Sequence, residues 1–502
     1  MAALAWLDGV VGQCLTATNT DVVVPAGSKG PVPLDQASRT PLLAYESLFA
    51  AFPLSMASYP AIALRLQKAD PDLLRESLAA ALAEQGGLLA GRLVDGGRAV
   101  ALTDDGVPFT VARRPEPSAP QQIPEPDLLH LADFRRPGRV VAGLDPVMTV
   151  KLTCFRDGSA VLCLCRTHGV LDGSSAWAFL DEWSRHARGE ASASSRQGAA
   201  RRPALHNLLP EKNRLDEMAT ELLGRPLGSS LLTTAIKTSL STFGAASDPL
   251  FLAGMTGDLS RPRVFLSHAE VARIKAAATP PSGAGAKWVS TQEALTAYIL
   301  LTIGRATLPA CSLGRAMVTF ILDARRACGL QENALCGAGV ILRRCSMRGL
   351  LSMTLSQVAS ELHEQSQAAQ VADGKMWQLI AGAAETGVEL DVLQTQVNPL
   401  DYDICLVINN QSKRRLPDFG PEAGGGRAQA ALTNSGPVLL FPAEGGVDVF
   451  LHWSLLRTAG SASAAAAAVA ALRDELPPPR PPASPLPQFA APGGGRAALG
   501  GA

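Results

Sequence analysis

One stretch, residues 160–183 (AVLCLCRTHGVLDGSSAWAFLDEW), most constrains how this chain folds. Its first seven residues form an apolar run that is typical of a buried strand. The short turn HGVLDG follows at residues 168–173. After the turn, apolar residues return at helical spacing: Ala176, Phe179, Leu180 and Trp183. The pattern predicts a strand, a tight turn and a helix, with His168 where the strand ends.

Loops at strand ends, held by a rigid sheet, are common places for reactive side chains. An imidazole there can take up a proton near neutral pH, which is the task of a general base. Asp172, four residues on, can orient the ring or brace the loop, and Gly173 allows a close turn into the helix. The alternative is a polar turn with no chemical role, because this spacing also arises by chance.

Composition indicates a globular protein that acts on small molecules. Hydrophobic residues make up 47% of the 502 residues and charged residues 18%, as in folded proteins of two or three domains. The 45 basic and 45 acidic side chains give a formal net charge of zero. That balance argues against nucleic acid or an anionic membrane as the main partner. The apolar runs are too short to cross a bilayer.

The nine cysteines form no CxxC pair and have no histidine at zinc-ligand spacing, so we predict no metal site. Most lie in apolar runs, as reduced core thiols do, which favours a reducing compartment. The N-terminal segment has no basic residue before Lys29 and does not resemble a signal peptide. We expect a cytoplasmic protein.

Strands and helices alternate along the chain. In the first half we expect a helix at 72–85, a hairpin about 95–97, and strands at 147–155 and 160–165 joined by a second hairpin. In the second half, Ser267 and Ser290 each precede a glutamate by three residues, which predicts two capped helices. The other expected elements are a strand ending at Asp323, a helical region at 353–385, a strand at 403–411, a hairpin at 437–453 and a closing helix at 461–476.

These elements divide the chain into an N-terminal α/β domain at 1–188 and a C-terminal α/β domain at 263–476. Residues 189–262 lack strong apolar periodicity and are interpreted as a linker or crossover. Residues 477–502 are rich in Pro, Gly and Ala and are expected to be disordered. We expect a ligand site between the two domains.

Several motifs, taken in order, resemble those of the BAHD acyltransferases, which move an acyl group from coenzyme A to an alcohol or amine. The resemblance covers roughly residues 22–455. The matching motifs are His168 with Asp172 and Gly173 (HxxxDG), residues 77–93 ending in LAGRL, STQEAL at 290–295, Asp323-Ala-Arg325 at a strand end, and Asp418-Phe419-Gly420, the front of DFGWG.

The resemblance implies an α/β fold of two similar mixed-sheet domains, of the chloramphenicol acetyltransferase-like type, with the active site at their interface. It implies acyl-CoA as co-substrate without a permanently bound cofactor, a small-molecule alcohol or amine as acceptor, a monomer, and a role in specialised metabolism. His168 is the predicted general base. We expect a ternary complex, because the HxxxD core holds no Cys or Ser to carry the acyl group.

The resemblance also implies that Asp172 turns away from the ring and pairs with Arg325, bracing the loop. We prefer this interpretation because a bidentate arginine holds a loop well. The alternative for Arg325 and Arg326 is a solvated strand edge. Asp418 and Gly420 belong to a structural loop that the resemblance places far from the chemistry.

Further candidates come from the strand at 403–411 and the residues after it. Asn409 and Asn410 are candidate donors to the oxyanion. Lys413 and Arg414 are candidate phosphate contacts for coenzyme A, although surface charge runs are commonly only solvated.

The chain departs from the family pattern at three places: Pro421-Glu422 replaces Trp-Gly, Gly337-Ala338 replaces Gly-Asn, and the second arginine comes one residue early, at Arg326. We therefore expect a divergent member. The nearest alternatives are a condensation-type or wax-ester acyltransferase, which carries a second histidine where this chain has Thr167, and a catalytically silent binding protein of the same fold.

Overall fold

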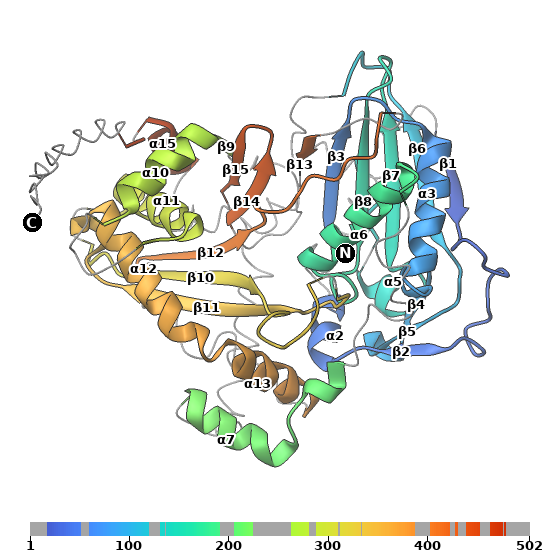
Figure 1. Ribbon diagram of the computed structural model, residues 1–502, viewed down its shortest axis with the longest axis horizontal. Helices are drawn as coiled ribbons and strands as arrows, with labels where there is room; N and C mark the ends of the chain where they lie inside the picture. Colours follow the sequence, from blue (N-terminus) through green and yellow to red (C-terminus); the bar gives the residue numbers. More distant parts are fainter. Residues whose placement is uncertain are drawn as a thin grey trace, which may run out of the picture.

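The computed structural model contains two six-stranded mixed sheets, each with helices packed against it (Figure 1). It describes residues 18–51, 60–119, 131–135, 137–190, 205–223, 263–280, 288–309, 312–332, 334–386, 402–421, 427–429, 438–451, 462–474 and 476–477. The predicted disordered tail lies outside these residues, apart from Pro477, and so does the N-terminal segment 1–17.

The first sheet is built almost entirely from the N-terminal half. Its strands, in spatial order, are β1 (Thr18–Val23), β6 (Val107–Arg113), β7 (Met148–Cys154), β8 (Ala160–Arg166), β3 (Ala61–Leu66) and β13 (Arg427–Gln429). Only β6 and β7 run parallel; the other neighbours are antiparallel. The predicted hairpin of β7 and β8 is confirmed, and β8 is buried along its whole length.

Two helices, α3 (Pro71–Glu84) and α6 (Gly173–Ala187), pack together in this half of the molecule. Asp70 caps α3, and Leu74, Leu78 and Leu82 form the buried stripe that the sequence predicts. Trp183 of α6 is fully buried, and its indole Nε1 donates to the Leu74 carbonyl at 3.2 Å. Burial of these apolar faces holds α6, and with it the turn that precedes it, in a fixed place.

Smaller elements complete this half. They are β2 (Arg39–Pro41), α2 (Ala44–Ala51), the short helices at Leu88–Ala90 and Asp95–Gly97, β4 (Arg92–Val94), β5 (Ala99–Ala101) and α5 (Pro137–Val141). β4 and β5 pair antiparallel around residues 95–97, as predicted. In α2, Ser47 donates to the carbonyl of Gly97, so this helix is tied to the hairpin.

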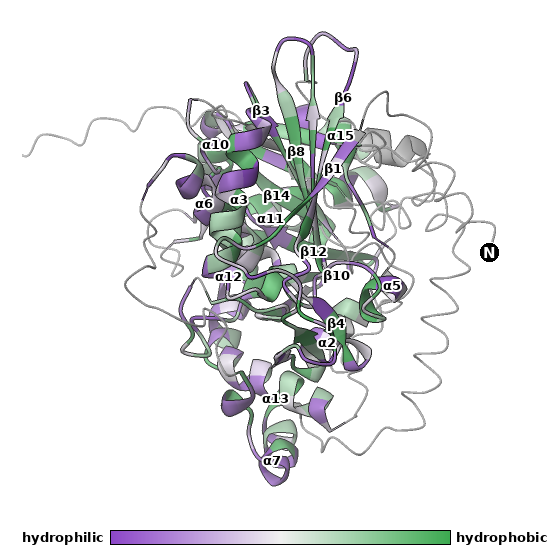
Figure 2. Ribbon diagram, turned by 90° about the vertical axis from the view of Figure 1, so that its right-hand side faces the viewer, coloured by the Kyte–Doolittle hydropathy of each residue, from purple (hydrophilic) through white to green (hydrophobic). Residues whose placement is uncertain are grey.

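The second sheet has the same mixed character. Its strands, in spatial order, are β11 (Val340–Met347), β10 (Ala316–Asp323), β12 (Ile404–Asn410), β14 (Val438–Ala443), β15 (Gly446–Phe450) and β9 (Arg263–Ser267). β10, β12 and β14 are parallel, and the hairpin of β14 and β15 is the one that the sequence predicts. Figure 2, which colours residues by hydropathy, has the first sheet nearer the viewer, and its buried strand β8 is mostly apolar.

Five helices of the described residues accompany this sheet: α10 (His268–Ala278), α11 (Thr291–Thr307), α12 (Leu355–Gln370), α13 (Asp373–Glu385) and α15 (Ala462–Asp474). Capping boxes begin α10 at Ser267 and α11 at Ser290, so the structural interpretation of both serines is confirmed. The region predicted as helical at 353–385 is two helices, preceded by the short helix Leu350–Ser352.

The two halves are not cleanly separated. β13 comes from the predicted C-terminal domain, yet it pairs with β3 of the first sheet. The predicted linker also contains structure, namely a short helix (Leu205–Leu208) and α7 (Lys212–Leu223). α7 packs on α13 through a small apolar cluster of Leu215, Met218, Ala219 and Leu379. The predicted linker or crossover at 189–262 therefore includes a helix, α7, whose apolar residues recur at helical spacing.

Among the described residues, no helix has the length and apolar character needed to cross a membrane. The seven described cysteines are all thiols, and none forms a disulfide with another described residue.

Candidate active site

The predicted strand, turn and helix are present as β8, residues 167–172 and α6. Asp172 is the N-cap of α6, and its Oδ1 accepts a hydrogen bond from the Ser175 amide at 2.8 Å. This cap begins the helix directly after the turn. His168 lies within the turn and is half-buried.

The His168 ring faces the loop that joins β10 to β11 in the other half of the chain. Its Nδ1 lies 3.0 Å from the carbonyl oxygen of Gly337. A carbonyl can only accept, so Nδ1 carries the proton and the lone pair of the neutral ring lies on Nε2. This is the tautomer in which a histidine can receive a proton at Nε2.

Burial, together with the positive charge of Arg166, lowers the pKa of His168 to about 4. Arg166 ends β8 and is itself buried; its Nη1 donates to the carbonyl of Pro60 at 3.1 Å. Burial in turn lowers the pKa of Arg166 to about 10, so it remains a cation near neutral pH. The imidazole is therefore unprotonated at neutral pH, which is the state that a base requires.

Asp172 pairs with Arg325, as the resemblance implied. Arg325 Nη2 donates to Asp172 Oδ1 at 2.8 Å, and their side chains are 1% and 0% exposed. Burial alone would raise the pKa of the Asp172 carboxyl, but the charge and hydrogen bond of Arg325 bring it below its usual value. Asp172 Oδ2 accepts from the Gly339 amide at 3.0 Å. Both carboxylate oxygens of Asp172 thus accept hydrogen bonds from groups other than the imidazole. The neighbouring arginine, Arg326, is exposed.

Residues that the sequence analysis did not single out extend this contact between the halves. Ser175 Oγ accepts from Arg325 Nη2 at 2.8 Å and from the Cys336 amide at 3.0 Å. The amide of Asp172 donates to the Cys336 carbonyl at 2.9 Å. Ser174 donates to Asp323 at 2.5 Å. No local signal marks such contacts, because each joins segments that are far apart in the sequence.

Two glycines allow the loops to meet backbone to backbone. A Cβ on Gly337 would lie 2.0 Å from the carbonyl oxygen of Gly169, the residue after the histidine. A Cβ on Gly169 would lie 2.7 Å from the carbonyl oxygen of Glu46 in α2. No side chain fits at either position, so both must be glycine.

Glu46 is a second residue that the sequence analysis missed. It is 0% exposed, and its Oε1 accepts from the Gly337 amide at 2.8 Å. Its Oε2 accepts from the Leu43 amide at 2.9 Å, as a glutamate in the first turn of a helix does. Nothing in residues 44–51 alone signals the contact between Glu46 and the distant Gly337.

The candidates around β12 lie close to the start of α6. A Cβ on Gly173 would lie 3.4 Å from the Gln411 side chain. Arg414 contacts Ser174 and lies 3.3 Å from Asp323, while Lys413 is exposed. The amide oxygens of Asn409 and Asn410 accept from Gln411 and Ser412 in the following turn. The roles predicted for these residues stay predictions.

The DFG segment packs at the opposite end of α6. Phe419 is fully buried and meets the Trp183 ring edge-on, with centroids 5.3 Å apart. Arg188, just after α6, donates to the Asp418 carbonyl. Gly420 has φ +86°, a conformation that favours glycine, and its amide donates to Asp418 Oδ1 at 2.9 Å. The length of α6, 15 residues, separates this end from His168 by about 20 Å.

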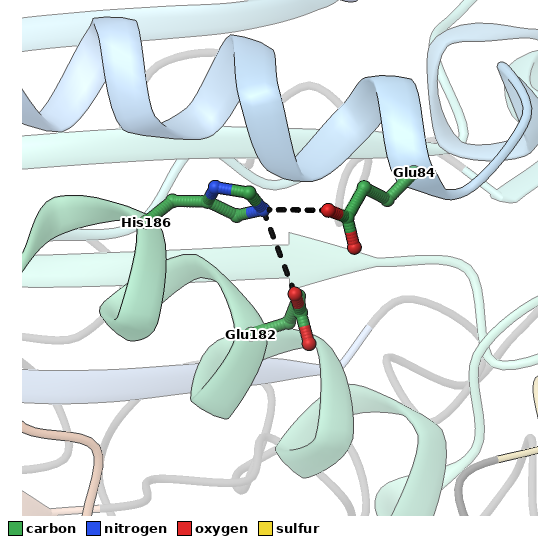
Figure 3. A group of neighbouring side chains, drawn as sticks. All are labelled: Glu84, Glu182 and His186. Atoms are coloured by element: carbon green, nitrogen blue, oxygen red, sulfur yellow. Dashed lines mark ion pairs between the residues drawn. The ribbon is translucent and has the colours of Figure 1, made fainter. Parts of the chain in front are cut away.

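One group of described residues brings carboxylate and imidazole atoms within reach of a common ion: Glu84, Glu182 and His186 (Figure 3). His186 Nε2 lies 3.3 Å from Glu84 Oε1 and 3.5 Å from Glu182 Oε1. These contacts join α6, which carries His186 and Glu182, to Glu84 at the end of α3. No sequence motif marks this group of three residues.

Known proteins resemble this chain in part of its sequence and in its fold. A sequence model of the Transferase family matches residues 59–220, the part that contains β8, the His168 turn and α6. No curated protein matches the chain by sequence.

Among solved structures, vinorine synthase is 15% identical with a TM-score of 0.56, covering 88% of this chain and 97% of its own. TRI101 of F. graminearum, complexed with coenzyme A and T-2 mycotoxin, is 18% identical with a TM-score of 0.60; 84% of this chain and 96% of that chain are covered. TRI101 of F. sporotrichioides, complexed with coenzyme A and T-2, is 15% identical with a TM-score of 0.58, covering 83% and 96%.

At this level of identity the structures establish the fold, an α/β arrangement of two mixed-sheet domains, so the predicted fold class is confirmed. With the family match, they also confirm the predicted resemblance to the BAHD acyltransferases.

Proposed function

We propose that this protein transfers an acyl group from an acyl-CoA thioester to a hydroxyl or amine of a small molecule, with His168 as general base. The observation that carries the proposal is the contact of His168 Nδ1 with the Gly337 carbonyl, because it leaves the lone pair of the ring on Nε2. The TRI101 structures, which contain coenzyme A with T-2 mycotoxin or deoxynivalenol, support the class of both substrates.

The reaction needs no covalent acyl-enzyme. The acceptor's proton passes to His168 Nε2 as the acceptor's oxygen or nitrogen bonds to the thioester carbonyl carbon. The tetrahedral oxyanion then collapses, the carbon–sulfur bond breaks, and the proton passes from Nε2 to the leaving thiolate. Although the pKa of about 4 makes a weak base, the proton affinity of the ring rises as negative charge develops beside it.

Asp172 and Arg325 hold the turn that presents His168. Their pair is buried and joined to the backbone at Gly339 and Ser175, so the turn cannot shift without leaving a buried charge unpaired. We assign Asp172 a bracing role. Asn409 and Asn410 as oxyanion donors, and Lys413 and Arg414 as coenzyme A contacts, complete the proposed site.

The test is release of coenzyme A thiol by the purified protein with a panel of acyl-CoA thioesters and small alcohols and amines. We expect acceptor-dependent release that falls at least ~100-fold in His168→Ala. The matched control is His206→Ala, a histidine that is 43% exposed, which should leave release unchanged. Release that is unchanged in His168→Ala would overturn the assignment of the base.

Initial-rate patterns test the ternary complex. Intersecting lines are expected when both substrates are varied, and parallel lines would show a covalent intermediate instead. A protein that binds acyl-CoA but releases no thiol with any acceptor would favour the silent binding protein. The acceptor that reacts decides between O- and N-acylation.

A further inference from the structure

The buried carboxylate of Glu46 links α2 to the site from outside the motifs. Its two oxygens are divided between two amides, that of Leu43 at the start of its own helix and that of Gly337 in the other half of the chain. A carboxylate that is 0% exposed is costly to bury unless directed hydrogen bonds compensate. These contacts therefore constrain where the amide of Gly337 lies.

Gly337 depends on such contacts because it has no side chain to pack. Glycine is the residue with the greatest backbone freedom, and this one must approach Gly169 too closely to carry a Cβ. On one side its amide donates to Glu46, and on the other its carbonyl accepts from His168 Nδ1. A change at Glu46 is therefore transmitted to the carbonyl that sets the His168 tautomer.

We propose that Glu46 is a positioning residue for His168, acting through the backbone of Gly337. This inference rests on the proposed function in one respect, that His168 is the base. Glu46 holds the Gly337 carbonyl where it accepts the Nδ1 proton, and this keeps Nε2 turned to the acceptor in the form that takes a proton. Small displacements of a reacting group lower the rate of the chemical step strongly.

Glu46 also caps its own helix, so a purely structural role must be told apart from positioning. Glu385 offers the matched comparison. It lies at the end of α13, and its Oε1 accepts from the Ala44 amide of α2 at 2.5 Å, while its Oε2 lies 2.8 Å from Arg98. It anchors the same helix by a similar bond and lies outside the contact with Gly337.

The experiment compares Glu46→Gln with Glu385→Gln in the full-length protein. Glu46→Gln replaces one carboxylate oxygen by an NH₂ group, which would face the amide of Leu43 or of Gly337, so that hydrogen bond is lost. For this variant we expect kcat for thiol release to fall about 10- to 100-fold. The KM for acyl-CoA should change less than about threefold, because the change affects orientation of the base and not substrate contacts. Glu385→Gln should keep the kcat of the parent protein.

A second readout does not depend on turnover. In protein labelled with ¹⁵N at histidine, the two ring nitrogens of His168 are distinguished by which one carries the proton, and His168→Ala identifies their signals. The parent protein should show the Nδ1–H tautomer. Glu46→Gln should show a mixture of tautomers, and Glu385→Gln should show the parent pattern.

The outcomes separate this inference from the proposed function. A parent-like kcat together with an unchanged His168 signal in Glu46→Gln would overturn the positioning role, as would equal losses of kcat in the two variants. If His168→Ala retains activity, the proposed function fails, and the ¹⁵N signals alone decide whether Glu46 orients the ring. If Glu46→Gln does not fold, Glu46→Asp replaces it: a selective loss of kcat supports the proposal and parent-like values for both readouts overturn it.

Discussion

The two ends of α6 are held to the other half of the chain by different physical means. At the N-terminal end, Asp172 and Arg325 form a buried ion pair surrounded by backbone hydrogen bonds. At the C-terminal end, Phe419 packs its ring on Trp183, and the charges nearby, Arg188 and Glu190, are partly exposed. Buried charges require particular partners at particular distances, whereas apolar packing accepts more variation.

The departures from the family pattern lie at both ends of α6. Pro421, the described residue of the Pro421-Glu422 departure, follows Gly420 in the segment whose Phe419 ring packs on Trp183. Ala338 lies at the other end, but it contributes its backbone carbonyl, which accepts from Trp377 Nε1 at 3.0 Å. A different side chain there leaves that bond intact. Divergence is tolerated where the contact does not depend on the side chain that changes.

The largest effect is expected from Asp172→Asn. The change leaves Arg325 buried without its fully buried negative partner, so the free energy of unfolding should fall by about 3–5 kcal/mol, and kcat should fall with it. Urea unfolding measures the free energy of unfolding, and thiol release measures kcat. The control is Asp323→Asn, a carboxylate that also contacts Arg325 but is 34% exposed, which should cost at most about 1 kcal/mol. Loss of rate without loss of stability would show instead that Asp172 orients the ring.

A pH-dependent effect should follow from His168. Its pKa is about 4 in the folded protein and 6.5 in ordinary surroundings, so between these values the unfolded chain binds the proton more readily. The resulting contribution to stability is fully present above pH 6.5 and is lost as the pH falls to about 4. It amounts to at most about 3 kcal/mol. The measurement compares the free energy of unfolding of the parent with that of His168→Gln. The difference between the two proteins should change by most of this amount from about pH 7 to about pH 4.5. A difference that stays constant with pH would contradict the prediction.

A smaller effect is expected at the other end of the helix. Phe419→Leu keeps an apolar side chain but removes the edge-on contact with Trp183, which is worth about 1 kcal/mol. Stability should fall by at least that amount, because the smaller side chain also leaves part of a fully buried site unfilled, while kcat stays within about twofold of the parent. A loss of kcat comparable to that of Asp172→Asn would remove the distinction between the two ends.

The smallest effect is expected for Glu190→Gln. The Arg188–Glu190 contact is short, at 2.6 Å, but the carboxylate is 46% exposed and solvent screens the pair. The urea midpoint should not change measurably. A midpoint shift as large as that of Phe419→Leu would mean that the ion pair, and not the aromatic contact, holds this end.

Much of the fold could be predicted because local patterns specify local elements. The leucine stripe of α3, the capping boxes at Ser267 and Ser290 and the turn residues of the hairpins all act within a few positions of one another. α7 was missed because its short apolar stripe lies in a segment of mostly polar composition, and β13 because three residues carry no periodic signal.

The sequence by itself determined the strand, turn and helix around His168, and its motifs indicated the Asp172–Arg325 pair before any geometry was known. Only the tertiary structure decided which atoms meet there. The Gly337 carbonyl selects the tautomer of His168, and Glu46 holds Gly337, although these three residues come from distant parts of the chain. Hydrogen bonds between distant segments depend on how two sheets and their loops pack, and no spacing along the chain records that packing.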